Sequence, residues 1–114
     1  MTHRSQVTAH VLDAIHGRPA VGVPVLLEQW RGGAWAELAG AETDSDGRVS
    51  ELGPESVGAG RFRLTFDTGA YFGRSDQATL YPEVAVTFEI SDAVEHYHVP
   101  LLLSPFAYST YRGS

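Results

Sequence analysis

Apolar and polar side chains alternate with a period of two along most of the chain, which predicts β-strands rather than helices. The alternation is clearest at 60–67, where Phe62, Leu64 and Phe66 fall on one face. Clusters of Asp, Gly, Ser and Pro separate the alternating runs, as turn residues do. The pattern predicts strands at 7–12, 21–29, 35–43, 48–52, 60–67, 84–91, 95–103 and 106–111.

One helix and two turns complete the predicted elements. The stretch 68–78 is the only plausible helix, and it is short. Turns are predicted at 17–20 and 44–47, since Asp and Gly tolerate the left-handed backbone of tight turns. Seven or eight short strands with one brief helix are typical of an all-β antiparallel sandwich. A chain of 114 residues has the size of a single domain, which we expect to span 1–114.

Two of the predicted strands are apolar on both faces. His10 shares its strand face with Leu12, and His98 shares its face with Leu102. The opposite face of each strand packs in the domain core, and these second faces are too apolar for simple exposure to water. We therefore expect another subunit to cover the face that carries His10 and His98.

Composition limits the classes of function. Hydrophobic residues make up 43% and charged residues 19%, as in an ordinary globular protein. The formal net charge of −6, with eight Arg and no Lys, argues against nucleic acid as a partner. The absence of cysteine excludes disulfides, thiolate nucleophiles and cysteine-based zinc sites.

The sequence shows no targeting segment. Residues 1–5 lack the apolar core of a signal peptide. Apolar runs also stay well short of the ~20 residues that a transmembrane helix needs. We therefore expect a cytoplasmic protein without a membrane partner.

Histidines are the main candidates for chemistry. His3 stands near the terminus and His16 beside a turn, where solvated surface groups are expected. His10 stands in mid-strand, which by itself favours a structural role. His96 and His98 project from one strand face, so they could chelate a metal or supply a general base and its partner. A metal would need a third ligand, for which the candidates are His10 and Glu95.

The turn at 44–47 could suggest a calcium loop. With Gly47 at the sixth position of such a loop, Gly53 would occupy the twelfth, where no ligand is possible. An ordinary turn that delivers Arg48 to the next strand is preferred. Its guanidinium could hold an anionic or carbonyl-rich ligand, or it could be a solvated turn arginine. The sequence contains no nucleophile elbow, phosphate loop or dinucleotide fingerprint.

Residues 96–114 closely resemble the C-terminal signature of the 5-hydroxyisourate hydrolases, which are transthyretin-like proteins. The last four residues, 111–114, are the Tyr-Arg-Gly-Ser hallmark of that family. The blocks 10–13, 17–20 and 46–48 also match, in the same order, so the resemblance spans essentially the whole chain. One departure is that Ala9 precedes His10 where the family commonly has Thr or Ser, with Thr8 one place earlier.

The resemblance implies a transthyretin-like β-sandwich that assembles as a homotetramer, with its sites in a channel at the dimer–dimer interface. It implies hydrolysis of the lactam bond of 5-hydroxyisourate to 2-oxo-4-hydroxy-4-carboxy-5-ureidoimidazoline in urate degradation, with no metal and no organic cofactor. It leaves open the role of His96 and which histidine is the general base. The residues it makes catalytic are His10, Arg48, His98 and Ser114, and those it makes substrate-binding are His10, Arg48, Tyr111 and Arg112.

Transthyretin, the thyroid-hormone carrier, is the alternative within the same fold. It shares some of these blocks, including the Ser-Pro followed by Tyr-Ser-Thr at 104–110. The carriers lack the histidines, the arginine and the terminal tetrapeptide, all of which this chain has. Hormone binding without catalysis is therefore the lesser interpretation, and a purely structural role is the third.

Overall fold

The computed structural model describes residues 5–114, which form nine strands and one short helix. His3 lies outside the described residues. The elements, in chain order, are β1 Val7–Asp13, β2 Arg18–Pro19, β3 Pro24–Arg31, β4 Ala34–Glu42, β5 Arg48–Val49, β6 Gly60–Phe66, α1 Thr68–Gly73, β7 Val84–Ile90, β8 Tyr97–Ser104 and β9 Ala107–Thr110.

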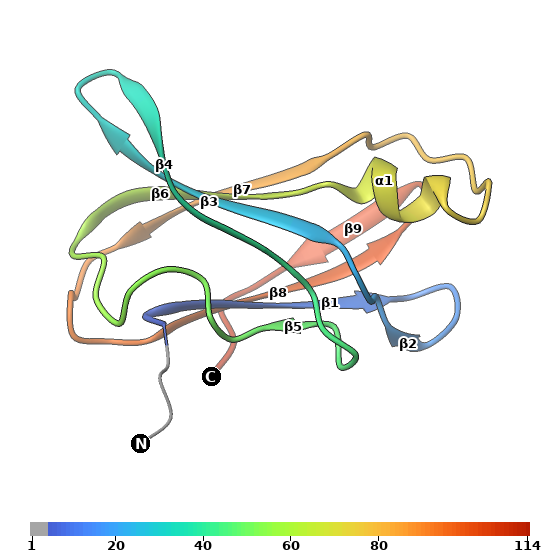
Figure 1. Ribbon diagram of the computed structural model, residues 1–114, viewed down its shortest axis with the longest axis horizontal. Helices are drawn as coiled ribbons and strands as arrows, with labels where there is room; N and C mark the ends of the chain where they lie inside the picture. Colours follow the sequence, from blue (N-terminus) through green and yellow to red (C-terminus); the bar gives the residue numbers. More distant parts are fainter. Residues whose placement is uncertain (1–4) are drawn as a thin grey trace.

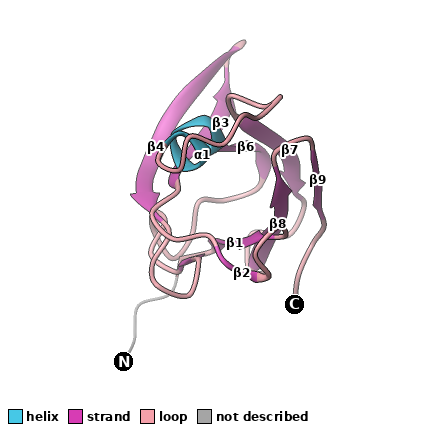
Figure 2. Ribbon diagram, turned by 90° about the vertical axis from the view of Figure 1, so that its right-hand side faces the viewer, coloured by secondary structure: helices cyan, strands magenta, loops and turns pink. Residues whose placement is uncertain are grey.

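Two sheets pack face to face, which confirms the predicted sandwich (Figure 1; Figure 2). One sheet has the strand order β2-β1-β8-β9, with β5 also paired to β1, and the other has the order β4-β3-β6-β7. The strands pair antiparallel apart from β1 and β8, which run parallel. Parallel neighbours need a long crossover, and here all four strands of the second sheet intervene in sequence between β1 and β8.

The core lies between the sheets, where the alternation predicts it. Phe62, Leu64 and Phe66 of β6 are fully buried, and so are Leu101 and Leu103 of β8. Burial of a side chain of this size contributes about 1.5–3 kcal/mol relative to exposure. The positions between them point outward, so period-two patterning fixes which face of each strand is left for a functional site.

The predicted turn at 17–20 is wrong, because Arg18–Pro19 pairs with β1 as β2. The chain turns between Asp13 and Gly17 instead. Gly17 adopts a φ of 63°, and its N–H donates to the carbonyl oxygen of Asp13 at 2.9 Å. The strand predicted from residue 21 starts only at Pro24, because Gly22 has a φ of 76°, which a regular strand does not accommodate.

The helix predicted at 68–78 ends at Gly73. Asp67 caps its start by accepting a hydrogen bond from the N–H of Ala70 at 3.0 Å. Beyond its end, Asp76 has a φ of 54°, through which a right-handed helix cannot continue. In the part of the chain that the structure describes, no helix is long and apolar enough to cross a membrane.

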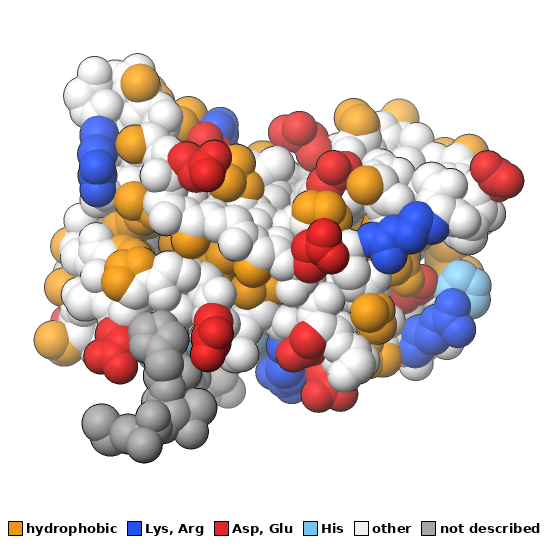
Figure 3. Space-filling view, in the orientation of Figure 1, with side chains coloured by type: hydrophobic (Ala, Val, Ile, Leu, Met, Phe, Trp, Pro, Cys, Tyr) orange, Lys and Arg blue, Asp and Glu red, His pale blue; other side chains and the backbone are white. Residues whose placement is uncertain are grey.

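The surface reflects the net negative charge. On the face shown in Figure 3, acidic side chains are spread over the molecule and arginines lie among them. This distribution agrees with the formal charge of −6.

Candidate active site

His10, Arg48 and His98 lie on the outer face of the sheet that contains β1, β5 and β8. His10 is paired with Arg48 across β1 and β5, and β8 flanks the other edge of β1 with His98 opposite Thr8. The ring centroids of His10 and His98 are 6.3 Å apart. The fold therefore brings two histidines and an arginine from three separate strands to one sheet face.

The turn before β5 places Arg48 beside His10. The carboxylate of Asp44 accepts hydrogen bonds from the backbone N–H groups of Asp46 and Arg48, both at 2.9 Å. The bond from the Arg48 backbone is the main reason why the pKa of Asp44 lies below its usual value. Gly47 closes the turn with a φ of 74°, and its carbonyl oxygen accepts from the N–H of Val11 at 2.7 Å. The short Asp-Ser-Asp-Gly sequence thus fixes where β5 meets β1.

The ring of His10 has a defined protonation pattern. Its Nε2 lies 3.0 Å from the backbone carbonyl oxygen of Asp46. A carbonyl oxygen only accepts hydrogen bonds, so Nε2 carries the proton and Nδ1 carries the lone pair when His10 is neutral. Any proton that neutral His10 takes up is therefore taken up at Nδ1.

His96 joins the same cluster through a threonine. The Oγ1 atom of Thr8 lies 2.8 Å from Nδ1 of His98 and 2.9 Å from Nε2 of His96. The two imidazole rings are stacked with an interplanar angle of 17° and centroids 6.4 Å apart. The sequence pattern places both histidines on one face, but it does not identify Thr8, which becomes their neighbour only through the pairing of β1 with β8.

A metal at His96 and His98 would need a third ligand close to both. Within residues 5–114, no group of three or more His, Asp or Glu side chains is arranged to hold a metal ion. Glu95, one candidate third ligand, instead lies with Oε2 at 3.2 Å from Nη2 of Arg112.

The C-terminal tetrapeptide runs back along β8 beside this cluster. The N–H of Gly113 donates to the carbonyl oxygen of His98 at 2.8 Å, which forms an isolated bridge between the two residues. Tyr111 and Ser114 are exposed. The chain end therefore flanks His98, and the side chains of Tyr111 and Ser114 are open to solvent.

The side chain of Arg112 contacts Glu95, His96 and Tyr97. Its Nη2 donates to Oε2 of Glu95 and to the carbonyl oxygen of His96, both at 3.2 Å, and its Cζ lies 4.1 Å from the ring centroid of Tyr97. A guanidinium over a tyrosine face is a cation–π contact. The structure thus does not bring the charged end of Arg112 to His10 and Arg48, although the sequence hypothesis groups them.

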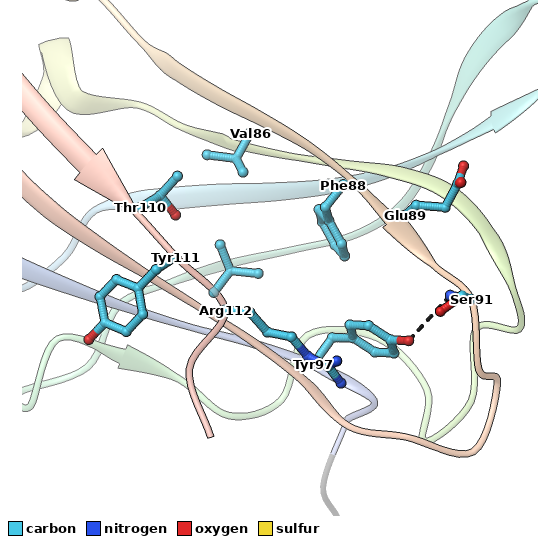
Figure 4. Close-up of a pocket in the computed structure, with 9 residues that line it drawn as sticks. Val86, Phe88, Glu89, Ser91, Tyr97, Thr110, Tyr111 and Arg112 are labelled. Atoms are coloured by element: carbon cyan, nitrogen blue, oxygen red, sulfur yellow. Dashed lines mark hydrogen bonds between the residues drawn. The ribbon is translucent and has the colours of Figure 1, made fainter.

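A cavity of about 340 Å³ lies at one edge of the sandwich, between edge strands β7 and β9. Figure 4 shows Arg112 reaching the ring of Tyr97 from one side of the cavity, while the ring of Tyr111 points away from it. The hydroxyl oxygen of Tyr97 accepts from the N–H groups of Ser91 and Asp92 at 3.2 Å, and the bond from Asp92 is the largest cause of its lowered pKa. The lining residues are Val86, Phe88, Glu89, Ser91, Tyr97, Val99, Thr110, Tyr111 and Arg112, so the cavity excludes His10, Arg48 and His98.

Sequence comparison finds one matching family and relatives that are named as hydrolases. The HIUase/Transthyretin family model matches residues 7–113. A 5-hydroxyisourate hydrolase of Salmonella typhimurium is 50% identical over 109 residues, covering 95% of this chain and 80% of the relative. The mouse 5-hydroxyisourate hydrolase is 41% identical over 116 residues, covering 99% of this chain and 98% of the relative.

Solved structures agree. Klebsiella pneumoniae 5-hydroxyisourate hydrolase superposes with a TM-score of 0.85 at 37% identity, over 95% of this chain and 98% of the other. Transthyretin from Sparus aurata superposes with a TM-score of 0.91 at 33% identity, over 96% of this chain and 97% of the other. The chain therefore belongs to the HIUase/Transthyretin family.

Proposed function

We propose that this chain is a 5-hydroxyisourate hydrolase, which hydrolyses the lactam bond of 5-hydroxyisourate to 2-oxo-4-hydroxy-4-carboxy-5-ureidoimidazoline in urate degradation. The observation that carries the proposal is that His10, Arg48 and His98 share one sheet face, with the two imidazole centroids 6.3 Å apart. Relatives named 5-hydroxyisourate hydrolase, which match 95% and 99% of the chain, support it.

Attack of water on the lactam carbonyl needs a general base, a group that stabilises the oxyanion, and a fixed substrate. His10 can serve as the base through Nδ1, since its Nε2 donates to Asp46. His98 can serve through Nε2 when its Nδ1 donates to Thr8. General base assistance is worth about 10²–10⁴-fold, so replacing the base histidine should lower kcat by a factor in this range.

Arg48 supplies positive charge to the same site. Its side chain is exposed on the face that carries His10. The forked donors of a guanidinium match the carbonyl oxygens of the substrate and can stabilise the negative charge that develops on the attacked oxygen. The scheme requires no metal and no organic cofactor.

The terminal tetrapeptide completes the proposed site. Tyr111 binds the substrate beside His98, and Ser114 orients the substrate or one of the histidines. We propose that Arg112 first anchors this segment, because Glu95 and Tyr97 hold its guanidinium. Its direct contact with the substrate stays a prediction.

The proposal includes a homotetramer with the sites at the dimer–dimer interface. Leu102 on the His98 face is 37% exposed, and Tyr111 in the adjacent terminal segment is 56% exposed. An apolar surface beside ionisable groups is one that a second subunit can cover and desolvate. The absence of cysteine suits a reducing compartment, and the cytoplasm stays our prediction for where the protein works.

Hormone binding is the second candidate. It is favoured by the structure of sea bream transthyretin in complex with thyroxine, which superposes with a TM-score of 0.90 over 95% of this chain at 32% identity. This alternative predicts binding of thyroxine without turnover of 5-hydroxyisourate. It also predicts that replacing His10 or His98 has no effect on the decay of 5-hydroxyisourate.

The test is the ultraviolet decay of 5-hydroxyisourate, freshly made from urate by urate oxidase, with and without the protein. We expect fast decay with the protein that is strongly reduced by Arg48→Gln and by truncation before Tyr111. Arg18→Gln is the matched control, since Arg18 is also an exposed strand arginine but lies beside β1 away from His10. Decay no faster than the spontaneous reaction would refute the proposal and make thyroxine binding the next measurement.

A further inference from the structure

We infer that Thr8 is a positioning residue for His98, and that His96 is the far end of a hydrogen-bonded relay that runs His98–Thr8–His96. The inference deepens the proposed function, because it rests on His98 acting as the general base. Thr8 is only 7% exposed, so its hydroxyl is largely removed from water and is held by its neighbours. Its position opposite His98 is fixed by the parallel register of β1 and β8.

The geometry places one hydroxyl between two imidazoles. Oγ1 of Thr8 is within hydrogen-bonding distance of Nδ1 of His98 at 2.8 Å and of Nε2 of His96 at 2.9 Å. Alternation along one strand puts the two rings on the same face, and they stack at an angle of 17°. A strand threonine that only filled space would need neither of these contacts.

Counting protons links the two rings. A threonine hydroxyl has one proton to donate and two lone pairs with which to accept. It can donate to only one of the two ring nitrogens, so the other nitrogen must carry a proton and donate to Oγ1. The protonation pattern of His96 therefore restricts that of His98 through Thr8.

Only one direction of the relay leaves His98 able to act as a base. If Nδ1 of His98 donates to Thr8, then Nε2 of neutral His98 carries the lone pair that can accept a proton from water. The hydroxyl proton of Thr8 then points to Nε2 of His96, which accepts it. In the reverse direction Nε2 of His98 already holds a proton, and neutral His98 cannot act as a base through that atom.

This direction also suits the charged state that follows proton transfer. When Nε2 of His98 takes the proton from water, the Nδ1–H of the resulting imidazolium still donates to Oγ1 of Thr8. The hydrogen bond between His98 and Thr8 does not have to be broken or turned during the step. In serine hydrolases a carboxylate gives the histidine this orientation, and here a neutral hydroxyl backed by a second imidazole does so.

The chain end restrains the same ring from another side. The N–H of Gly113 donates to the carbonyl oxygen of His98, and Gly113 packs against Cδ2 of the ring. The imidazole is thus held by Thr8 at Nδ1 and by the terminal segment at its carbon edge. The ring is therefore restrained on two sides, and the contact with Thr8 restricts which of its nitrogens carries the proton.

The test compares Thr8→Val, which keeps the shape and removes the hydroxyl, with Thr8→Ser, which keeps the hydroxyl. Thr87→Val, on β7 of the other sheet, is the matched control. Long-range ¹H–¹⁵N NMR of protein labelled with ¹⁵N-histidine reports which nitrogen of neutral His98 is protonated. Steady-state kinetics give kcat and KM for 5-hydroxyisourate.

We expect a proton on Nδ1 of His98 in the wild type and in Thr8→Ser, and loss of this pattern in Thr8→Val. We expect Thr8→Val to lower kcat by about 10- to 100-fold, within the range of general base assistance, with KM changed less than about twofold. Thr8→Ser should recover most of the lost kcat. His96→Leu should act in the same direction as Thr8→Val, and His96→Gln, which can still accept from the hydroxyl, should be milder.

The relay is refuted if the wild type carries the proton on Nε2 of His98, whatever the kinetics show. It is equally refuted if Thr8→Ser is as impaired as Thr8→Val, or if both variants leave kcat unchanged. These outcomes are separate from failure of the proposed function. The NMR measurement needs no turnover, whereas a wild-type protein that does not accelerate decay of 5-hydroxyisourate would refute the activity itself.

Discussion

Gly113 lies so close to the ring of His98 that a Cβ atom at this position would stand 2.7 Å from Cδ2 of the imidazole. The same Cβ would stand 3.1 Å from Cγ of Pro100. Carbon atoms do not approach to 2.7 Å without displacement of one group, so only glycine lets the chain end pack on His98. The close packing on His98 therefore explains why the third residue of the terminal tetrapeptide is glycine.

Gly113→Ala should displace either the His98 ring or the chain end. We expect kcat/KM to fall by about tenfold or more, since a shift of the order of 1 Å in a reacting group can cost about 10²-fold. The unfolding free energy should change by less than about 1 kcal/mol, because the terminal segment contributes little burial. Gly73→Ala is the control, since a Cβ there meets nothing within 4 Å. Unchanged kinetics in Gly113→Ala would contradict the prediction.

Gly47 is a second position where the backbone requires glycine. Its φ is 74°, and a Cβ there would lie 2.4 Å from the carbonyl oxygen of Val11. We expect Gly47→Ala to lower the unfolding free energy by about 2–3 kcal/mol, through left-handed strain and the clash together. Activity should fall as well, because the turn sets the position of Arg48.

Gly32→Ala separates the two causes of that loss. Gly32 also has a positive φ, 57°, but a Cβ there meets nothing within 4 Å. Urea unfolding of both variants should show a clearly smaller loss for Gly32→Ala, about 1 kcal/mol. Equal losses of unfolding free energy in the two variants would mean that the clash with the carbonyl oxygen of Val11 does not destabilise Gly47→Ala.

Period-two alternation predicts a large part of this site. It fixes that His96 and His98 share a face, that His10 faces outward, and that Phe62, Leu64 and Phe66 face the core. These relationships lie within one strand, where geometry depends only on sequence spacing. For this reason they could be predicted without knowledge of the sheet order.

Relationships between strands could not be obtained in this way. Thr8 meets His98 because β1 and β8 run parallel, whereas the sequence pattern suggests an antiparallel sandwich throughout. Arg48 meets His10 through a strand of two residues, which is too short to show any periodicity. Arg112 turns to Tyr97 because the aromatic face and Glu95 offer its guanidinium partners that its own segment lacks.

Tyr71 ties α1 to the end of β1. Its hydroxyl donates to Oδ2 of Asp13 at 2.7 Å, and Asp13 is only 1% exposed. We expect Tyr71→Phe to lower the unfolding free energy by about 2 kcal/mol, since hydrogen bonds to charged groups contribute about 1.5–3 kcal/mol. Burial, and then the bond to Asp13, raises the pKa of Tyr71 to about 12.

The raised pKa of Tyr71 makes the stability difference between wild type and Tyr71→Phe depend on pH. A raised pKa stabilises the folded state at pH values below the unfolded pKa, about 10 for tyrosine. The difference in stability between wild type and Tyr71→Phe should therefore be constant up to about pH 10. It should shrink as the pH rises through the folded value of about 12. Urea unfolding at neutral and alkaline pH checks this, and a difference that grows with pH would contradict it.

The contribution of Asp13 to stability depends on pH in the opposite sense. Burial raises the pKa of its carboxyl, but hydrogen bonds from Tyr71 and His16 outweigh burial and leave the pKa below its ordinary value. Because the folded pKa is lowered, the stabilisation is present above the unfolded pKa of about 4 and is lost as the pH falls through the folded value. We expect the stability deficit of Asp13→Asn to be largest above about pH 4 and to narrow below it. A deficit that stays the same at acid pH would show that ionisation of Asp13 is not responsible.

Arg112→Ala tests whether this side chain anchors the chain end or touches the substrate. Its guanidinium lies 4.1 Å from the Tyr97 centroid and 3.2 Å from Oε2 of Glu95. An exposed ion pair contributes at most about 1 kcal/mol and a cation–π contact about as much. Anchoring therefore predicts a stability loss of about 1–2 kcal/mol, together with a lower kcat as Gly113 loses its hold on His98.

Glu95→Gln is the matched control, because it removes the ion pair and leaves the contact between Arg112 and Tyr97. It should cost less than about 0.5 kcal/mol, since both partners are about half exposed, and kcat should be close to that of the wild type. A rise in KM for Arg112→Ala at unchanged thermal stability would instead assign the guanidinium to the substrate. Since its present partners hold it away from His10, that outcome would require Arg112 to exchange Tyr97 for the substrate on binding.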